Sequence, residues 1–362
     1  MQAKYKRVAV KVGSNVLTRP DGTLDVTRMS AIVDDIATLR AMGVEVILIS
    51  SGAVASGRSE LRGMPMKHLD TVGQRQLFSA VGQAKLINRY YELFREHNIA
   101  VGQVLTMKES FSTRRLYLNQ RNCMMVMLEN GVLPIVNEND TVSVTELMFT
   151  DNDELSGLVA SMMDVQALVI LSNVDGVYNG VPGDEGVEVI RRVEQGKDLT
   201  DYIQATKSSF GRGGMMTKCS IARKVADEGI AVYIANGKRE GTLTSIVVAP
   251  DDVVCTCFVP SETPVSSIKK WIAHSAGFVK GSIVLNEKAV AAICGEKAVS
   301  ILPVGVVGVE GNFWRDDLVQ IVASDGTVLG VGRVAYDSEE IKDVMGKHGC
   351  KPVVHYNYLC LE

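Results

Sequence analysis

The sequence contains few cysteines and no sign of a framework of paired ones. Its seven cysteines are odd in number and scattered over 362 residues. Small disulfide-stabilised proteins carry dense, even sets of cysteines, so the pattern excludes that class and indicates a reducing compartment. Cys255 and Cys257 are one residue apart, but no second Cys or His pair follows at the spacing of a zinc site. We interpret them as small residues on a strand.

The chain also lacks a large excess of charge and a long apolar run. It has 38 Lys plus Arg against 42 Asp plus Glu, a net charge of −4, which gives no electrostatic reason to expect nucleic acid as a partner. The most membrane-like stretch, residues 155–174, is interrupted by Asp164 and is better explained as a helix followed by a buried strand. The first 13 residues contain no apolar core of signal-peptide length. We therefore expect a cytoplasmic protein without a membrane span.

The sequence does contain a repeated alternation of apolar strands and helical patterns. Short runs rich in Val, Ile and Leu occur at 7–12, 44–50, 101–107, 132–137, 167–173 and 231–236. Helical patterns lie between them, for example over residues 75–98. This alternation predicts an α/β fold with an open, mainly parallel sheet sandwiched by helices.

The character of the sequence changes after residue 245. Pro250, Pro260 and Pro264 indicate a last strand followed by a linker, and the segments beyond are short, β-rich and glycine-rich. Residues 324–327 have the composition of a hairpin turn. We therefore predict a first domain over residues 1–259, a linker over 260–267 and a small, mostly-β domain over 268–362.

The predicted strands of the first domain end in small or polar residues. In open α/β sheets, ligands bind outside the carboxyl ends of the strands, so these residues indicate one site. Lys11 interrupts a strand of valines, and such a lysine either lies at a strand edge or reaches an anion. Ser51 and Gly52 end a strand and open a helix, whose N-terminus either receives an anion or packs closely on the strand.

Two clusters of carboxylates and amides, residues 137–140 and 151–154, lie beside apolar segments. Asp151 and Glu154 have the spacing of a capping box, and the residues that follow give a helix one apolar face. A helix cap therefore explains that pair. It does not explain Asn152 and Asp153, so we interpret these two residues, together with the first cluster, as ligands of a small polar molecule.

A glycine-rich loop at 211–214 precedes a predicted helix that carries Lys218. Such a loop suits a phosphate group, although the chain has neither a Walker A loop nor a G-x-G-x-x-G motif. Two lysines, two helix N-termini, a glycine loop and an aspartate predict phosphoryl transfer, which requires charge neutralisation and alignment more than covalent catalysis. The five histidines stand apart from these clusters.

Six segments, in order along the chain, resemble the glutamate 5-kinases of the amino acid kinase family: VKVGSNVL, SSGAVASGR, VLPIVNENDTV, DNDELSGLVA, SNVDGVY and GRGGMMTK. The segment KKWIAHSAGFVKGSIVLNEKAVAAI resembles the PUA domain that many bacterial members carry. The resemblance implies phosphorylation of the γ-carboxylate of L-glutamate to L-glutamyl 5-phosphate, with ATP and Mg²⁺. This reaction would be the first step of proline biosynthesis, with proline as feedback inhibitor. We also expect a homo-oligomer, either a dimer or a tetramer.

The resemblance also assigns residues to roles. Lys11 and Lys218 would bind the transferring phosphoryl group, and Asp153 would hold and orient both lysines. The substrate-binding residues that it implies are Ser51, Gly52, Asn137, Asp140 and Asn152. The nucleotide-binding residues that it implies are Lys11, Gly13, Ser172, Asn173, Arg212, Gly213, Gly214, Met215, Met216, Thr217 and Lys218. No protein ligand is assigned to a metal, since Mg²⁺ would arrive mainly with ATP.

The sequence departs from the family pattern only on the nucleotide side. Asn173 stands in place of Asp, Arg212 in place of a small or hydroxyl residue, and residues 179–182 in place of T-x-D-P. If this protein differs from the family, we therefore expect the difference to lie in its affinity for the nucleotide or in its choice of nucleotide.

Two alternatives stay open. The first is an amino acid kinase that acts on acetylglutamate or aspartate, against which Asp140 and Asn152 argue. The second is an RNA-binding regulator acting through the C-terminal domain. Residues 265–362 contain ten Lys plus Arg and eleven Asp plus Glu, a net charge of −1, which argues against a nucleic-acid site.

Overall fold

The computed structural model describes residues 2–65, 67–143, 152–197, 199, 214–262, 270–272, 279–295 and 299–361. Their contacts divide the chain into two compact units. The first comprises Met1–Lys108 and Arg121–Pro264, and the second comprises Glu109–Gln120 and Val265–Glu362. In the described part of the chain, no helix combines the length and the hydropathy that crossing a membrane requires.

The first unit is built on an eight-stranded sheet with the order β3-β4-β2-β1-β5-β7-β8-β6. The strands are β1 Arg7–Val12, β2 Glu45–Ser50, β3 Val101–Thr106, β4 Leu133–Glu138, β5 Ala167–Ser172, β6 Arg192–Val193, β7 Ala231–Asn236 and β8 Cys255–Phe258. The six strands from β3 to β7 in this order run parallel, whereas β8 pairs antiparallel with β7. The predicted open, mainly parallel sheet is therefore confirmed, and Cys255 and Cys257 lie on its strand β8.

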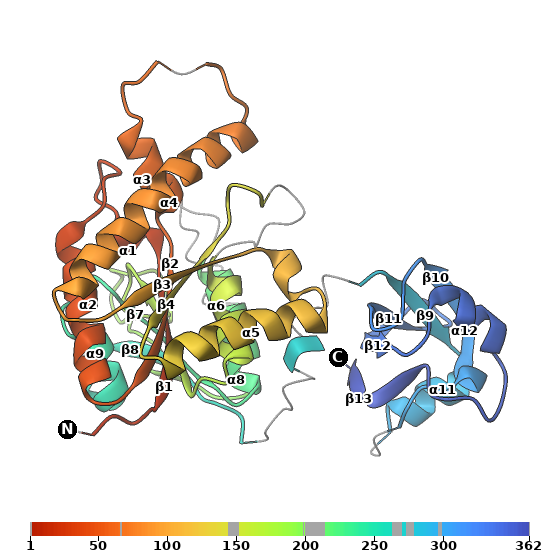
Figure 1. The fold of residues 1–362 in the computed structure, drawn as a ribbon. Coiled ribbons are helices and arrows are strands. Elements are labelled where there is room, and N and C mark those ends of the chain that lie inside the picture. The colour runs from red at the N-terminus through yellow and green to blue at the C-terminus, as the bar shows by residue number, and fades with distance from the viewer. Residues whose placement is uncertain are drawn as a thin grey trace. The chain divides into compact units, whose positions relative to one another are not determined.

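Helices cover both faces of this sheet (Figure 1). The helices of this unit are α1 Ser14–Leu17, α2 Val26–Ala41, α3 Ala53–Glu60, α4 Thr71–Arg95, α6 Asn152–Met162, α8 Met215–Asp227 and α9 Thr242–Val248, with a short 3₁₀ turn, η3 Pro250–Asp252. Two further elements, η1 Lys108–Phe111 and α5 Arg114–Glu129, are shared in sequence with the second unit. Asp25 caps α2 by accepting from the amide of Arg28, and Asp70 caps α4 by accepting from the amide of Gly73 at 2.7 Å. These caps explain where the two longest amphipathic patterns before β3 begin.

The alternation of side chains along β1 assigns each residue to one face of the sheet. Val8, Val10 and Val12 belong to a core cluster together with residues of α2, α4 and α9. Ala9 and Lys11 therefore face the opposite side, where α6 packs against β1 and α8 packs against α6. β1 lies in the middle of the sheet, so Lys11 is directed into the interior of the unit and not toward an edge.

The second unit contains a five-stranded sheet with the order β10-β9-β11-β12-β13. Its elements are β9 Gly281–Leu285, α11 Glu287–Ile293, η5 Pro303–Gly305, β10 Val306–Gly311, β11 Leu318–Ala323, β12 Val328–Val334, α12 Ser338–Val344 and β13 Val354–Leu361. β11 and β12 pair antiparallel on either side of residues 324–327, as the hairpin signal predicted. The mostly-β character predicted for this part of the chain is confirmed.

The second unit also includes residues 109–120, which come from η1 and the start of α5. Trp271 is 1% exposed, and its indole N–H donates to the carbonyl oxygen of Phe111 at 3.0 Å. The guanidinium of Arg114 lies 5.1 Å from the ring centroid of Tyr117 and 5.8 Å from that of Trp271. This aromatic and cationic cluster links a segment next to β3 in sequence with one that precedes β9.

Candidate active site

The buried lysine of β1 has a carboxylate partner. Lys11 has a side chain that is only 6% exposed, and its Nζ lies 2.5 Å from Oδ1 of Asp153. Asp153 is the second residue of α6, the helix that covers this face of β1. A lysine buried in a central strand would be costly without such a partner, so the ion pair explains how the strand accommodates it. The strand-edge alternative for Lys11 is wrong.

A second lysine reaches the same carboxylate from another helix. Lys218 lies in the first turns of α8, which begins directly after Gly214, and its Nζ lies 2.9 Å from Oδ2 of Asp153. Asp153 thus holds two ammonium groups, one through each oxygen. The lysines come from positions more than 200 residues apart, and the packing of α6 between β1 and α8 brings them together.

Asp153 is almost entirely buried, at 1% exposure. Burial alone would raise the pKa of its carboxyl group, but the nearby charges of Lys11 and Lys218 and their hydrogen bonds outweigh it, so that the pKa lies below the ordinary value of 3.8. The carboxylate is therefore ionised at neutral pH. One negative and two positive charges make this end of the site suitable for a phosphate group.

Three predicted substrate residues meet at the N-terminus of α6. Asn152 donates through Nδ2 to Oγ of Ser51 at 2.8 Å and to Oδ1 of Asn137 at 3.0 Å. Ser51 follows β2, Asn137 lies on β4, and the order of the sheet makes these strands neighbours. Gly52, which caps α3, has φ of 108°, a conformation that favours glycine and that lets α3 start directly after β2.

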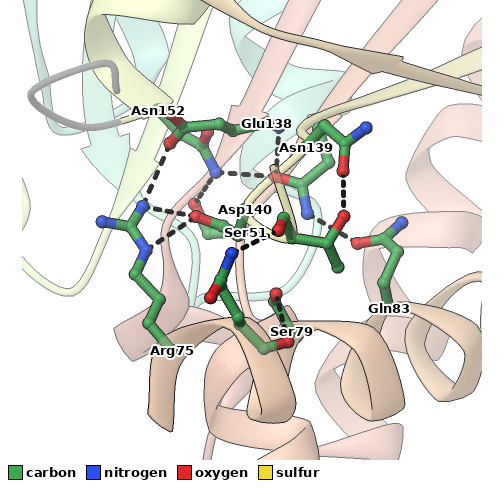
Figure 2. Close-up of polar contacts among 11 residues, drawn as sticks. Ser51, Arg75, Ser79, Gln83, Glu138, Asn139, Asp140 and Asn152 are labelled. Atoms are coloured by element: carbon green, nitrogen blue, oxygen red, sulfur yellow. Dashed lines mark hydrogen bonds and ion pairs between the residues drawn. The ribbon is translucent and has the colours of Figure 1, made fainter. Parts of the chain in front are cut away.

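Asp140 lies next to this group but is bound by a residue that the sequence analysis missed. Nε of Arg75 donates to Oδ1 of Asp140 at 2.9 Å, and Nη2 of Arg75 contacts the same oxygen. Nη2 also lies 3.2 Å from Oε2 of Glu138, at the end of β4. Figure 2 shows Arg75 reaching both carboxylates from α4, below the residues that follow β4.

Gln83 is a second residue that the sequence analysis missed. Its Oε1 accepts from Nδ2 of Asn137 at 2.8 Å, which fixes the amide of Asn137 toward Asn152. Arg75, Ser79 and Gln83 recur at intervals of four residues on α4 and face the site (Figure 2). A polar stripe with this spacing inside an otherwise amphipathic helix is a signal that could have identified them from the sequence.

A cavity of about 940 Å³ adjoins this polar group. Its lining includes apolar side chains, such as those of Ile87 and Leu105, and the polar residues Glu138, Asn139, Asp140, Ser79 and Gln83. A volume of this size is typical of a site for a small organic molecule.

The predicted nucleotide residues lie at the ends of β1 and β5 and at the start of α8. The amide of Gly13 donates to the carbonyl oxygen of Leu171 at 3.1 Å, which places Gly13 beside Ser172. Ser172 is buried at the end of β5, and Asn173 is exposed. Gly214 precedes α8, and Met215, Met216 and Thr217 form its first turn. Arg212, Gly213 and Asp151 lie outside the described residues.

Asp175 is a further polar residue near the end of β5. It accepts from Nδ2 of Asn236 at 3.0 Å and pairs with Arg239 at 2.7 Å, so it joins the carboxyl ends of β5 and β7. The motif SNVDGVY contains Asp175, but its position in that motif carried no signal of this contact.

The residues of the site are compatible with a metal ion that arrives bound to a nucleotide. Among the residues that the structure describes, no group of three or more His, Cys, Asp or Glu side chains is placed to hold a metal. Asp153 has its two oxygens on two ammonium groups. Mg²⁺ in nucleotide sites is bound largely by phosphate oxygens and water, which is compatible with this arrangement.

Comparisons with known proteins agree on one family. Residues 6–236 match the amino acid kinase family, and residues 281–356 match the PUA domain. The glutamate 5-kinase of Bacteroides thetaiotaomicron is 69% identical over 100% of both chains. That of Chlorobaculum tepidum is 46% identical over 99% of this chain and 98% of its own, and that of Myxococcus xanthus is 40% identical over 98% and 93%.

A solved structure of isopentenyl phosphate kinase supports the fold alone. It has 15% sequence identity and a TM-score of 0.50, and the match covers 70% of this chain and 100% of the other. The three relatives are matched over 93% to 100% of their own length, which establishes the family. The chain belongs to the amino acid kinase family, among the glutamate 5-kinases, and carries a PUA domain toward its C-terminus.

Proposed function

We propose that the site described above transfers the γ-phosphoryl group of ATP to the γ-carboxylate of L-glutamate. The product is L-glutamyl 5-phosphate, and the reaction is the first step of proline biosynthesis. One observation carries the proposal: a buried carboxylate, Asp153, holds the ammonium groups of Lys11 and Lys218 at 2.5 and 2.9 Å. The names of the full-length relatives support the choice of substrate.

The reaction needs charge neutralisation and no general base. The γ-carboxylate of glutamate is already ionised at neutral pH, so it attacks the phosphorus atom without giving up a proton. What opposes the attack is repulsion between two anions, together with the charge on the transferring group. Lys11 and Lys218 offset that charge, and Asp153 keeps both ammonium groups in place before the substrates bind, so that little reorganisation is needed.

The two ends of glutamate bind to different parts of the polar group. Ser51 and Gly52 bind the γ-carboxylate through hydroxyl and backbone N–H donors, and Asn152, whose amide N–H groups hold Ser51 and Asn137, orients the hydroxyl of Ser51 toward it. Asp140 lies farther along and binds the α-ammonium group as an ion pair. Asn137 holds Asn152 through a hydrogen bond of 3.0 Å. This order directs the γ-carboxylate toward the lysines.

The nucleotide binds along the carboxyl ends of β1 and β5 and the start of α8. Gly13, Ser172 and Asn173 lie at the strand ends, and Gly214 precedes the helix turn that carries Met215, Met216, Thr217 and Lys218. Arg212 and Gly213, which come just before Gly214 in the sequence, belong to the same proposed site. Backbone N–H groups at the N-terminus of α8 suit the phosphate oxygens. Mg²⁺, when bound with ATP, withdraws charge from the phosphate oxygens, and the protein residues hold the complex in position.

Regulation, assembly, location and domain limits belong to the same proposal. Proline, which has an α-ammonium and an α-carboxylate as glutamate has, would compete for Asp140 and act as inhibitor. The chain would assemble as a dimer or tetramer. Its seven cysteines, odd in number and scattered along the chain, support a cytoplasmic location. The division into a kinase domain over 1–259, a linker over 260–267 and a PUA domain over 268–362 is kept as our proposal.

The test is an assay of ATP turnover with Mg²⁺ and hydroxylamine, which traps an acyl phosphate as a hydroxamate. L-Glutamate, L-aspartate and N-acetyl-L-glutamate are supplied in turn. Hydroxamate should form with glutamate alone, and added proline should lower its rate. Hydroxamate formed from aspartate or acetylglutamate in preference to glutamate would overturn the proposed substrate.

A further inference from the structure

Arg75 binds Asp140 in an asymmetric way. Two N–H groups of the guanidinium, on Nε and Nη2, reach the same oxygen, Oδ1. Within the described part of the chain, the other oxygen of Asp140, Oδ2, accepts no hydrogen bond from a protein group. Asp140 also lines the cavity of about 940 Å³. Arg75 therefore fixes one carboxylate oxygen and leaves the second without a protein donor, on a residue that lines the cavity.

We infer that Arg75 is a positioning residue that presents Oδ2 of Asp140 to the α-ammonium group of the amino acid substrate. The inference rests on the proposed function, because it takes Asp140 as the ligand of that ammonium. It goes further by making Arg75, which no sequence motif singled out, a determinant of substrate choice. Substrates with a free α-ammonium are favoured because Arg75 keeps Asp140 in the orientation that receives it.

Glu138 explains why a guanidinium is needed at this position. Glu138 and Asp140 leave the same strand end two residues apart, and their side chains are 4% and 11% exposed. Two carboxylates this close repel each other, and the repulsion is strong where little water screens it. Nη2 of Arg75 contacts both of them. Without the guanidinium, Asp140 would turn away from Glu138 and lose its orientation toward the cavity.

The shape of the arginine side chain matters as well as its charge. A guanidinium presents several N–H groups in a rigid plane, so Nε and Nη2 can hold one oxygen while Nη2 also reaches Glu138. A lysine ammonium at the same place keeps the charge but is a single point at the end of a flexible chain. Arg75→Lys is therefore expected to keep part of the orienting effect on Asp140, and Arg75→Gln is expected to keep none of it.

The test compares L-glutamate with glutarate, which has the same two carboxylates but no ammonium group. Steady-state kinetics of ADP release are measured for the native chain, Arg75→Gln, Arg75→Lys and Asp140→Asn. Arg75→Gln should raise KM for glutamate by about 10- to 100-fold, the cost of losing a hydrogen-bonded charged partner. The preference for glutamate over glutarate should fall by a similar factor, while KM for ATP stays within about two-fold.

Arg89→Gln is the matched control, because Arg89 lies on the same helix and pairs with Glu92 near the surface. It should leave all constants unchanged. If Arg75→Gln lowers kcat for both substrates but leaves the preference for glutamate over glutarate unchanged, the role of Arg75 is merely structural. This result overturns the inference. If Asp140→Asn lowers the preference and Arg75→Gln does not, only the inference about Arg75 fails. If Asp140→Asn also leaves the preference unchanged, the proposed substrate site fails with it.

Discussion

Asp153 unites the two lysines of the site, and its removal should affect catalysis more than substrate binding. Asp153→Asn keeps the shape of the side chain but no longer holds either ammonium by charge. We expect kcat to fall by about 10²-fold or more, the size of effect seen when a preorganised group at a transition state is lost. KM for glutamate should change little. Steady-state kinetics measure both constants, and a kcat near the native value would contradict the role of Asp153.

Asparagine is the better choice for this test than alanine. Asp153→Ala would leave Lys11 and Lys218 buried beside an empty space, and breaking a buried ion pair in this way costs about 3–5 kcal/mol of stability. A loss of activity in the alanine variant could then come from unfolding. Thermal unfolding of Asp153→Asn should be recorded beside its kinetics to separate the two causes.

The lowered pKa of Asp153 predicts how its contribution to stability changes with pH. A carboxyl group whose folded pKa lies below its ordinary value of 3.8 stabilises the protein above that value, and the contribution is lost as pH falls through the folded pKa. The difference in unfolding free energy between the native chain and Asp153→Asn should therefore be constant from about pH 7 to about pH 5 and shrink below about pH 4. Urea unfolding across this range measures it. A difference that already declines between about pH 7 and pH 5 would contradict the lowered pKa.

For the individual residues of the site, the sequence predicted which residue types take part better than it predicted which side chains they contact. Lys11 was ambiguous because a strand pattern alone does not say whether the strand is central, and only the order of the sheet decides that. Arg75 was not predicted, since it lies 63 and 65 residues from the two carboxylates that it binds. Its partners lie at the end of β4 and just after it, and only the packing of α4 against the sheet brings them within reach.

Among the elements, α3 and α4 pack closely because glycine, which has no side chain, occupies a contact position on each helix. A Cβ atom on Gly82 would lie 1.8 Å from the carbonyl oxygen of Ala53, and one on Gly57 would lie 1.8 Å from that of Phe78. The two helices therefore meet backbone to backbone. This contact places Ser51 and Gly52, just before α3, at a set distance from Gln83, the neighbour of Gly82 on α4.

Gly82→Ala should force the two helices apart. We expect a loss of stability of about 1–3 kcal/mol from overpacking and a rise in KM for glutamate, because Gln83 and Ser51 would no longer meet Asn137 and Asn152 together. Thermal unfolding and steady-state kinetics measure the two effects. Gly295→Ala in the second unit is the control, since its Cβ would meet only ordinary contacts at 3.5 Å. Equal results for the two variants would show that the close crossing has no special role.

The elements themselves were predictable, and their grouping was only partly so. Apolar runs identified the six parallel strands because buried strands are continuous in hydrophobicity. The grouping of residues 109–120 with the C-terminal unit was not predicted. It includes the contact of Trp271 with Phe111, two residues that lie 160 positions apart in the sequence. No local pattern encodes such a contact.

For the molecule as a whole, Trp271 is expected to tie two distant segments of the chain together. Trp271→Phe removes the N–H donor and leaves the carbonyl oxygen of Phe111 without it, which costs about 1–3 kcal/mol for a buried group. Hydrogen exchange should quicken in residues 109–120 more than in β1 or β5. Trp314→Phe, at a side chain that is 67% exposed, is the control and should leave exchange unchanged. Unaltered exchange in both variants would contradict the link.

These two tryptophans also give the molecule a natural optical label. They are the only two in the sequence, and they lie in opposite surroundings, one 1% and the other 67% exposed. A water-soluble quencher should reduce the emission of Trp314 and leave that of Trp271 largely intact. The unquenched, blue-shifted part of the emission then reports on the surroundings of Trp271 alone. The separation of residues 109–120 from 270–272 could thus be followed in real time without attaching a dye.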